Sequence, residues 1–436
     1  MKAPVAVGEQ GPGAAPDTGR PVESDFSPRK MIIASACLLG STFIPFVQVT
    51  IGPLMMLPMI KEFGWTRTEY AFATTILFVF GSITVLFFGR VADRIGVRPI
   101  LLMGALFGGA TMVLLSFQTS QLWRLYATYA LLGSFGSSGV GYTKVIGSLF
   151  TRHRGKALAL FGAESTVALA LLPVLANFFI SQFGWRGAYI AFGAIMFVLT
   201  PIIYFLVQEP GSRVARAGKA FASPDSSPVT PKRPPPMEGM TASEIRKDRV
   251  FWLIVLSSAL MGALNVGLNA HIIAAITDKG FSATVAASAL SVATLVGLVG
   301  TFAGGFAVDY FRTARIVSVF GLLSALGALL FAFASLSVGG LPLLIVSMAI
   351  QGAAVAAMRP SATYLQTRFF GLRAFGEANA IQVVCQGVGM AIAPPLFGII
   401  YDRVGTYMPV YWILVAGALA GSAPVSYTHL TLPTKA

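Results

Sequence analysis

Long apolar stretches alternate with short charged islands along the whole chain. Each stretch has about 20 residues or more, the length that an α-helix needs to cross a hydrocarbon core about 30 Å thick. Six stretches precede a polar segment at 208–250 and six follow it. The pattern predicts twelve membrane-spanning helices, at 31–60, 68–89, 99–118, 122–150, 156–182, 187–207, 251–276, 284–308, 314–336, 340–366, 377–401 and 407–425.

The composition agrees with this pattern. Of the 436 residues, 55% are hydrophobic and 11% are charged, whereas a soluble domain has about 25% charged residues. These values exclude a soluble enzyme, a disordered chain and a secreted disulfide scaffold. Both cysteines, Cys37 and Cys385, lie in apolar stretches, so neither a disulfide nor a metal centre is indicated and no cofactor is expected.

The net charge of +14 could indicate a nucleic-acid partner, but no basic stretch is interleaved with aromatic residues. The cations instead recur at the ends of the predicted helices. If the N-terminus is cytoplasmic, the cytoplasmic segments hold 22 Lys and Arg and the external segments hold six. This asymmetry predicts a multi-pass protein of a bacterial-type inner membrane with both termini in the cytoplasm, and we expect a monomer in the lipid bilayer.

The same reading divides the chain into five parts. Residues 1–30 are polar and rich in Gly and Pro, which predicts a disordered N-terminus. Bundles of six helices occupy 31–207 and 251–425, and 208–250 is a linker whose last residues, TASEIRKDRV, predict a short interfacial helix. The segment 426–436, SYTHLTLPTKA, is not the basic cytoplasmic tail that the other cytoplasmic segments lead us to expect, and it is interpreted as a non-native tail.

Two loops indicate an internal repeat of six helices. Each has a Gly four residues before an Asp at the end of the second helix of its half, with Arg following. The first loop resembles the major facilitator superfamily signature G-x-x-x-D-R-x-G-x-R/K, and the second departs from it at Tyr310. The matching residues are Gly89, Asp93, Arg94, Gly96 and Arg98 in the first loop and Gly305 and Asp309 in the second.

This resemblance implies an all-α membrane protein with two pseudo-symmetric halves, whose central cavity opens alternately to the two sides of the membrane. It also implies that the loop motif stabilises one of these conformations. Within the motif, Gly96 permits a tight turn and Asp93 can cap a neighbouring helix. Short strings resemble the monocarboxylate and oxalate–formate branch and imply a carboxylate substrate. They are Ile60–Arg67, Arg152–Ala157, Phe183–Arg186, Asn269–His271 and Asp402–Arg403.

Three ionisable residues fall inside predicted spans. A charge inside the bilayer is energetically costly, so each of these residues is a candidate for a structural or functional role. Lys144 and Glu164 lie ten residues before and after Arg154, so both are expected up to about 15 Å from that turn. They form a structural ion pair or a substrate-binding cation tuned by a protonatable Glu164, or else a helix boundary is misplaced. Arg359 lies in 340–366 at a depth equivalent to that of Lys144. It can bind a substrate carboxylate through two hydrogen bonds, or else its side chain snorkels to the interface or pairs with Glu164.

Other polar residues on helices that line the cavity in this family are weaker candidates. Gln48, Tyr142, Asn265 and Asn269 either orient the substrate or join helices, and the two Asn share a face because they are four residues apart. His271 is either a proton relay or a satisfied interfacial residue.

The branch assignment has departures that leave the substrate open. The oxalate-type cations are absent from 285–304, and Gln382 and Gln386 stand in 377–401. The monocarboxylate-type Lys of the first helix and the Asp–Arg pair of the eighth are also absent. We therefore predict a secondary transporter of a small organic anion that selects charge with Lys144 and Arg359.

A proton or a counter-anion is the expected co-substrate, with Glu164 as the coupling residue. The alternative is a multidrug or small-molecule efflux transporter of the same superfamily, although the G-P-x-x-G-G-like pattern of drug antiporters is absent from 162–173. An enzyme is not expected, because the three His are scattered and no carboxylates are paired.

Overall fold

The computed structural model describes residues 27–44, 47–150, 164–207, 240–311, 315–370 and 375–427. These residues are helical apart from short connections and one isolated bridge between Ser335 and Gly339. The predicted all-α class is therefore confirmed. The helices are α1 (Pro28–Phe43), α2 (Val47–Phe63), α3 (Arg67–Ile95), α4 (Val97–Leu115), α5 (Leu122–Gly136), η1 (Ser137–Gly139), α6 (Val140–Leu149), α8 (Glu164–Leu206), α10 (Ala242–Lys247), α11 (Arg249–Thr277), α12 (Ala283–Phe311), α13 (Arg315–Phe333), α14 (Gly340–Phe370), α15 (Phe375–Val404) and α16 (Met408–Tyr427).

The helices follow the predicted spans. The first span corresponds to α1 and α2 and the fourth to α5, η1 and α6, and α8 contains the sixth span and the described part of the fifth. Within α8 the backbone leaves the helical region at Gly184, where φ is 68°, a value that favours glycine. In the part of the chain that the structure describes, eight helices are long and apolar enough to cross a membrane, and two shorter apolar helices lie in α13 and α16.

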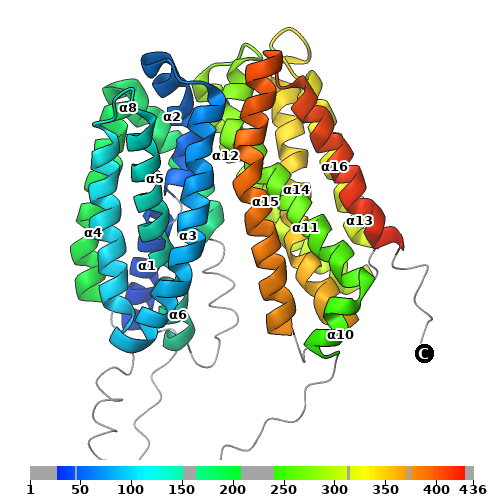
Figure 1. Cartoon of the computed structure of the whole chain (residues 1–436), viewed down its shortest axis with the longest axis horizontal. Helices are drawn as coiled ribbons and strands as arrows, with labels where there is room; N and C mark the ends of the chain where they lie inside the picture. The colour runs from blue at the N-terminus through cyan, green and yellow to red at the C-terminus, as the bar shows by residue number, and fades with distance from the viewer. Residues whose placement is uncertain are drawn as a thin grey trace, which may run out of the picture.

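The described helices form two groups that stand side by side (Figure 1). The first group comprises α1 to α8 and the second comprises α10 to α16. Equivalent helices pair in both groups, since α3 packs on α5 as α12 packs on α14, and α4 packs on α8 as α13 packs on α16. This recurrence agrees with the predicted repeat of six helices.

Glycines bring the paired helices together at matching places. A Cβ on Gly133 of α5 would lie 2.2 Å from the carbonyl oxygen of Leu77 on α3. In the second group a Cβ on Gly352 of α14 would lie 2.1 Å from the carbonyl oxygen of Ala293 on α12. Only glycine fits at these two contacts, because the neighbouring atoms belong to backbone.

The start of α1, the short helix α10 and the end of α16 lie at the same end of the two groups (Figure 1). We call this the terminal end, and the opposite end the closed end. Hydrogen bonds join the two groups toward the closed end: Ser291 Oγ donates to the Ala170 carbonyl at 2.6 Å, and Asn177 Nδ2 donates to Thr284 Oγ1 at 3.1 Å. Thr75 Oγ1 also donates to the Ala391 carbonyl.

The short helix predicted before the second group is present as α10. Thr241 and Glu244 form a capping box at its start, so side chains satisfy two of its free N–H groups. The buried Ile245 packs with Phe251 and Phe370, and the Met240 amide donates to the Phe370 carbonyl at 2.9 Å. The predicted segment boundaries at residues 1–30, 208–250 and 426–436 mostly fall outside the described residues and stay predictions.

Candidate functional site

A cavity of about 340 Å³ lies between the two helix groups. Its wall is formed by α2, α3, α5 and α8 on one side and by α11, α12, α14 and α15 on the other. This volume suits a small solute rather than a large ligand. The described lining is largely apolar and carries no Asp, Glu, Lys or Arg; its polar side chains are Gln48, Thr50, Tyr70, Thr74, Tyr129, Thr166, Asn265, Asn269, Thr294, Thr301 and Gln351.

One polar wall is a chain of hydrogen bonds within the first group. Gln48 Nε2 donates to the Tyr129 hydroxyl at 2.6 Å, and Tyr129 donates to the Tyr70 hydroxyl at 3.0 Å. Tyr70 in turn donates to the Gly52 carbonyl at 2.8 Å. Gln48 is 4% exposed, and its Oε1 is buried with no hydrogen-bond partner among the described residues. The chain fixes α2, α3 and α5 relative to one another at the cavity.

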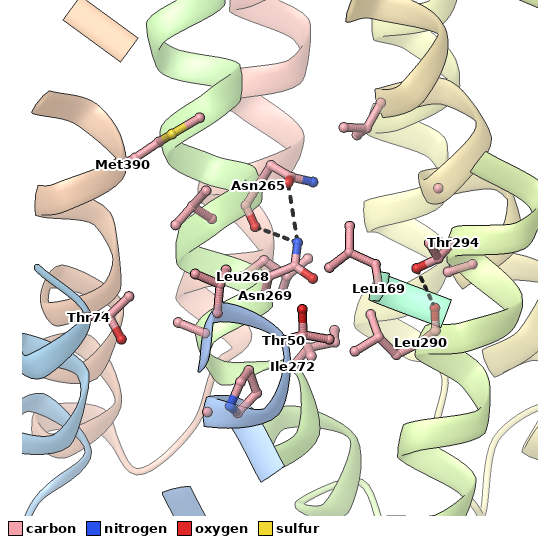
Figure 2. A pocket seen from close by; sticks show the side chains of 18 of the residues that line it. Thr50, Thr74, Leu169, Asn265, Leu268, Asn269, Ile272, Leu290, Thr294 and Met390 are labelled. Atoms are coloured by element: carbon pink, nitrogen blue, oxygen red, sulfur yellow. Dashed lines mark hydrogen bonds between the residues drawn. The ribbon is translucent and has the colours of Figure 1, made fainter. Parts of the chain in front are cut away.

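The opposite wall carries Asn265 and Asn269 on α11, which share a face as their spacing predicts. Figure 2 shows Asn269 Nδ2 directed at Asn265, and it donates to the Asn265 carbonyl at 2.9 Å and to Asn265 Oδ1 at 3.3 Å. Both residues line the cavity, together with Thr50 of α2. The two groups therefore each present amide or hydroxyl groups to the same space.

Six residues from both groups meet at the closed end. Arg67, at the start of α3, donates to both Asp278 carboxylate oxygens, from Nη1 at 2.8 Å and from Nη2 at 2.9 Å. Its guanidinium lies 3.6 Å from the centroid of the Tyr401 ring, and Nη1 also donates to the Tyr407 hydroxyl at 2.9 Å. We call these residues the closing cluster: Arg67, Thr68, Asp278, Tyr401, Asp402 and Tyr407.

Asp402 of the closing cluster caps α3 from the other group. Its carboxylate accepts from the Arg67 amide at 3.2 Å and from the Thr68 amide at 3.0 Å. The first N–H groups of a helix have no partner inside it, and the positive end of the helix favours an anion there. The second group therefore supplies both an anion for the α3 N-terminus and an anion for the Arg67 side chain.

His271 lies behind the closing cluster and is 1% exposed. Its Nε2 is 2.8 Å from the Pro394 carbonyl oxygen, and its Nδ1 is 2.9 Å from the Tyr407 hydroxyl. The carbonyl can only accept, so Nε2 carries the proton and Nδ1 accepts from Tyr407. Both ring nitrogens therefore have a partner, as the prediction of a satisfied interfacial residue requires, although the side chain is buried.

Lys144 lies on α6, which ends at Leu149, and Phe150 is extended. It is five residues, about 8 Å, from the end of that helix. Arg154, from which the expected depth is counted, lies outside the described residues, so this depth stays a prediction. The side chain of Lys144 is exposed and is not part of the cavity lining.

Tyr142 is fully buried in the first group, where a Cβ on Gly40 of α1 would meet its ring, and it is not part of the cavity lining. The side chains of Glu164 and Arg359 lie outside the described residues. Their backbone positions adjoin the wall, because Glu164 precedes Thr166 by two residues on α8 and Arg359 follows Ala356 by three on α14.

The loop motif is described only in part. Gly96 connects α3 and α4 with φ at 92°, the region that the predicted tight turn requires. Arg94 is exposed, and Arg98 lies 4.4 Å from the centroid of the Tyr204 ring and donates to the Tyr204 carbonyl. Nothing lies within 4 Å of a Cβ on Gly305. The side chains of Asp93 and Asp309, and the surroundings of Gly89, lie outside the described residues.

The closing cluster was not predicted from the sequence. Arg67 and Asp402 lie within the strings that resemble the monocarboxylate and oxalate–formate branch, and Asp278 and Tyr407 belong to no predicted site. A usable signal was present, since each lies at the apolar–polar boundary on the external side of the predicted topology, where few charges occur. Nothing local, however, pairs a residue with another more than 200 positions away.

Comparison with known proteins agrees with this architecture. Monocarboxylate transporter 11 of Homo sapiens is 27% identical over 355 residues, covering 78% of this chain and 70% of that protein. Monocarboxylate transporter 4 of Rattus norvegicus is 24% identical over 375 residues, covering 84% and 75%. A bacterial homologue of the human lysosomal transporter Spinster, in an inward-facing and occupied conformation, matches with a TM-score of 0.68 at 16% identity, covering 93% of this chain and 95% of that one.

An all-helical, multi-pass membrane protein with two similar helix groups around a central cavity has the architecture of a transporter. The family model described as Major Facilitator Superfamily matches residues 37–340 and 272–435, and the chain belongs to this superfamily. The predicted family and fold class are thereby confirmed. Since the relatives are named transporters, the chain is a secondary transporter and not an enzyme.

Proposed function

We propose that the protein moves a small organic anion, a mono- or dicarboxylate, across the membrane by alternating access. The observation that carries this proposal is the cavity between the helix groups, which both groups line and which contacts between the groups close at one end. The two named monocarboxylate transporters, each similar over more than three quarters of the chain, support the substrate class.

In the proposed orientation the terminal end faces the cytoplasm of a bacterial-type cell and the closed end faces outward. The excess of Lys and Arg in the segments of the terminal end supports it. The described conformation is then one that is closed to the outside. Cysteines introduced at Trp123 and at Arg246, both exposed and at opposite ends, would test the orientation. An impermeant thiol reagent applied outside should label only the first, and labelling of only the second would reverse it.

Charge selection is assigned to Lys144 and Arg359. The described cavity wall is uncharged, so a cation that attracts the carboxylate has to lie at its edge. The backbone position of Arg359 next to the lining residue Ala356 supports this role, and a guanidinium can bind a carboxylate with two parallel hydrogen bonds. The exposed side chain of Lys144, five residues before the end of α6, supports a role in attracting the anion.

Uptake of labelled mono- and dicarboxylates into proteoliposomes tests the substrate class. The unmodified protein should accumulate at least one of them, and the double variant Lys144→Gln with Arg359→Gln should lose at least 90% of that uptake. Arg403→Gln is the control, because Arg403 is an exposed cation near the closed end. Retained carboxylate transport in the double variant would refute the assignment of these two cations.

Proton coupling is assigned to Glu164, whose position on α8 lies two residues before Thr166 of the cavity wall. A carboxyl group at this place can carry one proton per cycle while the anion crosses. Glu164→Gln should abolish accumulation driven by a pH gradient and should retain exchange of labelled for unlabelled substrate. Unchanged pH-driven accumulation in this variant would refute the coupling role and leave a counter-anion as the co-substrate.

A second candidate is efflux of small apolar solutes. The observation that favours it is the described cavity wall, which is mostly apolar and uncharged. Thermal stabilisation of the purified protein separates the two functions. Stabilisation by carboxylates alone supports the first, whereas stabilisation by neutral or cationic dyes alone supports the second.

A further inference from the structure

Arg67 is a nearly buried cation that belongs to one helix group and is held entirely by the other. Its side chain is 9% exposed, and that of its ion-pair partner Asp278 is 33% exposed. The two side chains make a bidentate pair at 2.8 and 2.9 Å, and the Tyr407 hydroxyl accepts a third hydrogen bond from the guanidinium. The Tyr401 ring lies 3.6 Å from the guanidinium carbon, which removes water from that face of the cation.

This cation lies just beyond the cavity. On α3, Tyr70 follows Arg67 by three residues and lines the cavity; on α11, Ile272 precedes Asp278 by six residues and also lines it. A turn takes 3.6 residues, so the backbone of Arg67 lies within one turn of the wall on α3, and that of Asp278 lies within two turns of it on α11. The ion pair therefore joins the two groups between this part of the wall and the closed end.

The pair cannot survive the opening of that end. Its two members lie on different helix groups, so separation of the groups separates the charges. Removing one member of a buried pair leaves an uncompensated charge, which is strongly unfavourable. Another carboxylate could accept the same two hydrogen bonds in place of Asp278, because the guanidinium recognises the planar carboxylate group and not the residue that carries it.

We propose that Arg67 is a docking site for the carboxylate of the transported solute at the closed end, and that Asp278 occupies this site when the end is closed. The solute carboxylate replaces that of Asp278 as the helix groups separate, and Asp278 returns as the solute moves on to the cavity. This inference rests on the proposed anionic substrate and on the proposed outward orientation of the closed end.

Two variants distinguish this docking role from that of a lock, by which we mean an ion pair that only holds the closed end shut and does not bind the solute. Arg67→Gln removes the cation, and should raise the external KM for the transported carboxylate at least tenfold with less than a threefold change in the internal KM. Asp278→Asn removes the competing carboxylate and leaves the cation, and should leave the external KM unchanged or lower it. External and internal values come from right-side-out and inside-out vesicles.

Arg186→Gln is the matched control. Arg186 also lies toward the closed end and pairs with a carboxylate, Glu62, at 2.6 Å, but both residues belong to the first helix group. The pair can therefore remain intact when the groups separate. Its loss should change the external KM less than twofold, so a tenfold change in this variant would overturn the proposal as a general loss of positive charge.

A binding measurement covers variants that do not transport. Spin labels at Trp123 and Leu336, which are 64% and 63% exposed in the two groups, report the separation at the closed end. The transported carboxylate should increase the population of the separated form in Asp278→Asn and should have no effect in Arg67→Gln. Arg67→Lys, which keeps the charge without the bidentate fork, should respond at concentrations at least threefold higher than the unmodified protein.

The outcomes separate this inference from the function on which it rests. If no carboxylate is transported or bound by the unmodified protein, both are overturned. If carboxylates are transported and Arg67→Gln keeps its external KM, only the docking role is overturned. Equal effects of Arg67→Gln and Asp278→Asn on both the KM and the separation would reduce the pair to a lock, which also overturns it.

Discussion

His271 Nδ1 lies 2.9 Å from the Tyr407 hydroxyl oxygen and joins α11 to the residue that directly precedes α16. Tyr407 accepts at the same time from Arg67, so one phenol links the interior of the second helix group to the first. Both ring nitrogens of His271 are occupied, one by Tyr407 and one by the Pro394 carbonyl. The closing cluster thus has a defined support inside the second group.

The first prediction concerns this support. Tyr407→Phe and His271→Ala each leave buried polar groups without a partner, which costs about 1–3 kcal/mol. Each variant should lower the thermal unfolding temperature of the detergent-solubilised protein. Because they remove one shared hydrogen bond, the double variant should lose less than the sum of the two, by about 1 kcal/mol. Strictly additive losses would contradict the shared bond.

The second prediction concerns the charge of the cavity wall. Asn265→Asp keeps the side-chain oxygen that accepts from Asn269 and adds a negative charge to the lining. In a partly desolvated cavity this charge repels an anionic solute. We expect the KM for the transported carboxylate to rise about tenfold, a change of about 1.4 kcal/mol.

Asn177→Asp is the control for this charge. Asn177 lies outside the cavity lining, at the closed end, and its replacement can still accept from Thr284. It should change the KM less than twofold. A similar rise in both variants, or none in Asn265→Asp, would argue against an anion in this cavity.

The third prediction concerns the packing of α12 on α14. Gly352→Ala places a Cβ 2.1 Å from the carbonyl oxygen of Ala293, so the helices have to move apart. Overpacking of this kind costs about 1–3 kcal/mol, and the unfolding temperature should fall. Gly387→Ala, on a helical glycine with nothing within 4 Å, should leave it unchanged or slightly raised. Equal changes of the unfolding temperature in the two variants would show that the close approach of α12 and α14 does not require glycine at position 352.

The fourth prediction concerns pH. Lys279 follows α11, its Nζ donates to the Ala332 carbonyl at 2.9 Å, and it lies 4.7 Å from the centroid of the Tyr411 ring. Burial lowers the pKa of Lys279 from 10.5 to about 8. Above pH 8 the folded protein has released this proton while the unfolded chain still holds it. The free energy of unfolding therefore rises with pH from about 8 toward 10.5.

The comparison with Lys279→Met isolates this contribution. The difference in unfolding temperature between the unmodified protein and the variant should shift in favour of the unmodified protein as the pH rises from 7.5 to 9.5. Other groups titrate in both proteins and cancel in the difference. A difference that does not depend on pH would show that Lys279 keeps an ordinary pKa.

Local chemistry made much of the fold predictable. An apolar stretch of about 20 residues has one stable arrangement in a hydrocarbon core, because only a helix satisfies its backbone there. The turn at Gly96 and the shared face of Asn265 and Asn269 follow from rules that span a few residues. The depth of Lys144 stays a prediction, because it is counted from Arg154, which lies outside the described residues. Helix ends are set by contacts as well as by local sequence.

The spans, the repeat and the family could be predicted from the sequence, since each depends on the order of residues over short distances. Which side chains come into contact depends on how the helices pack. Arg67 and Asp278 are 211 positions apart, and Asp402 lies more than 300 from the helix that it caps. Their contact energy is gained only when the two helix groups meet, so no local pattern in the sequence records it.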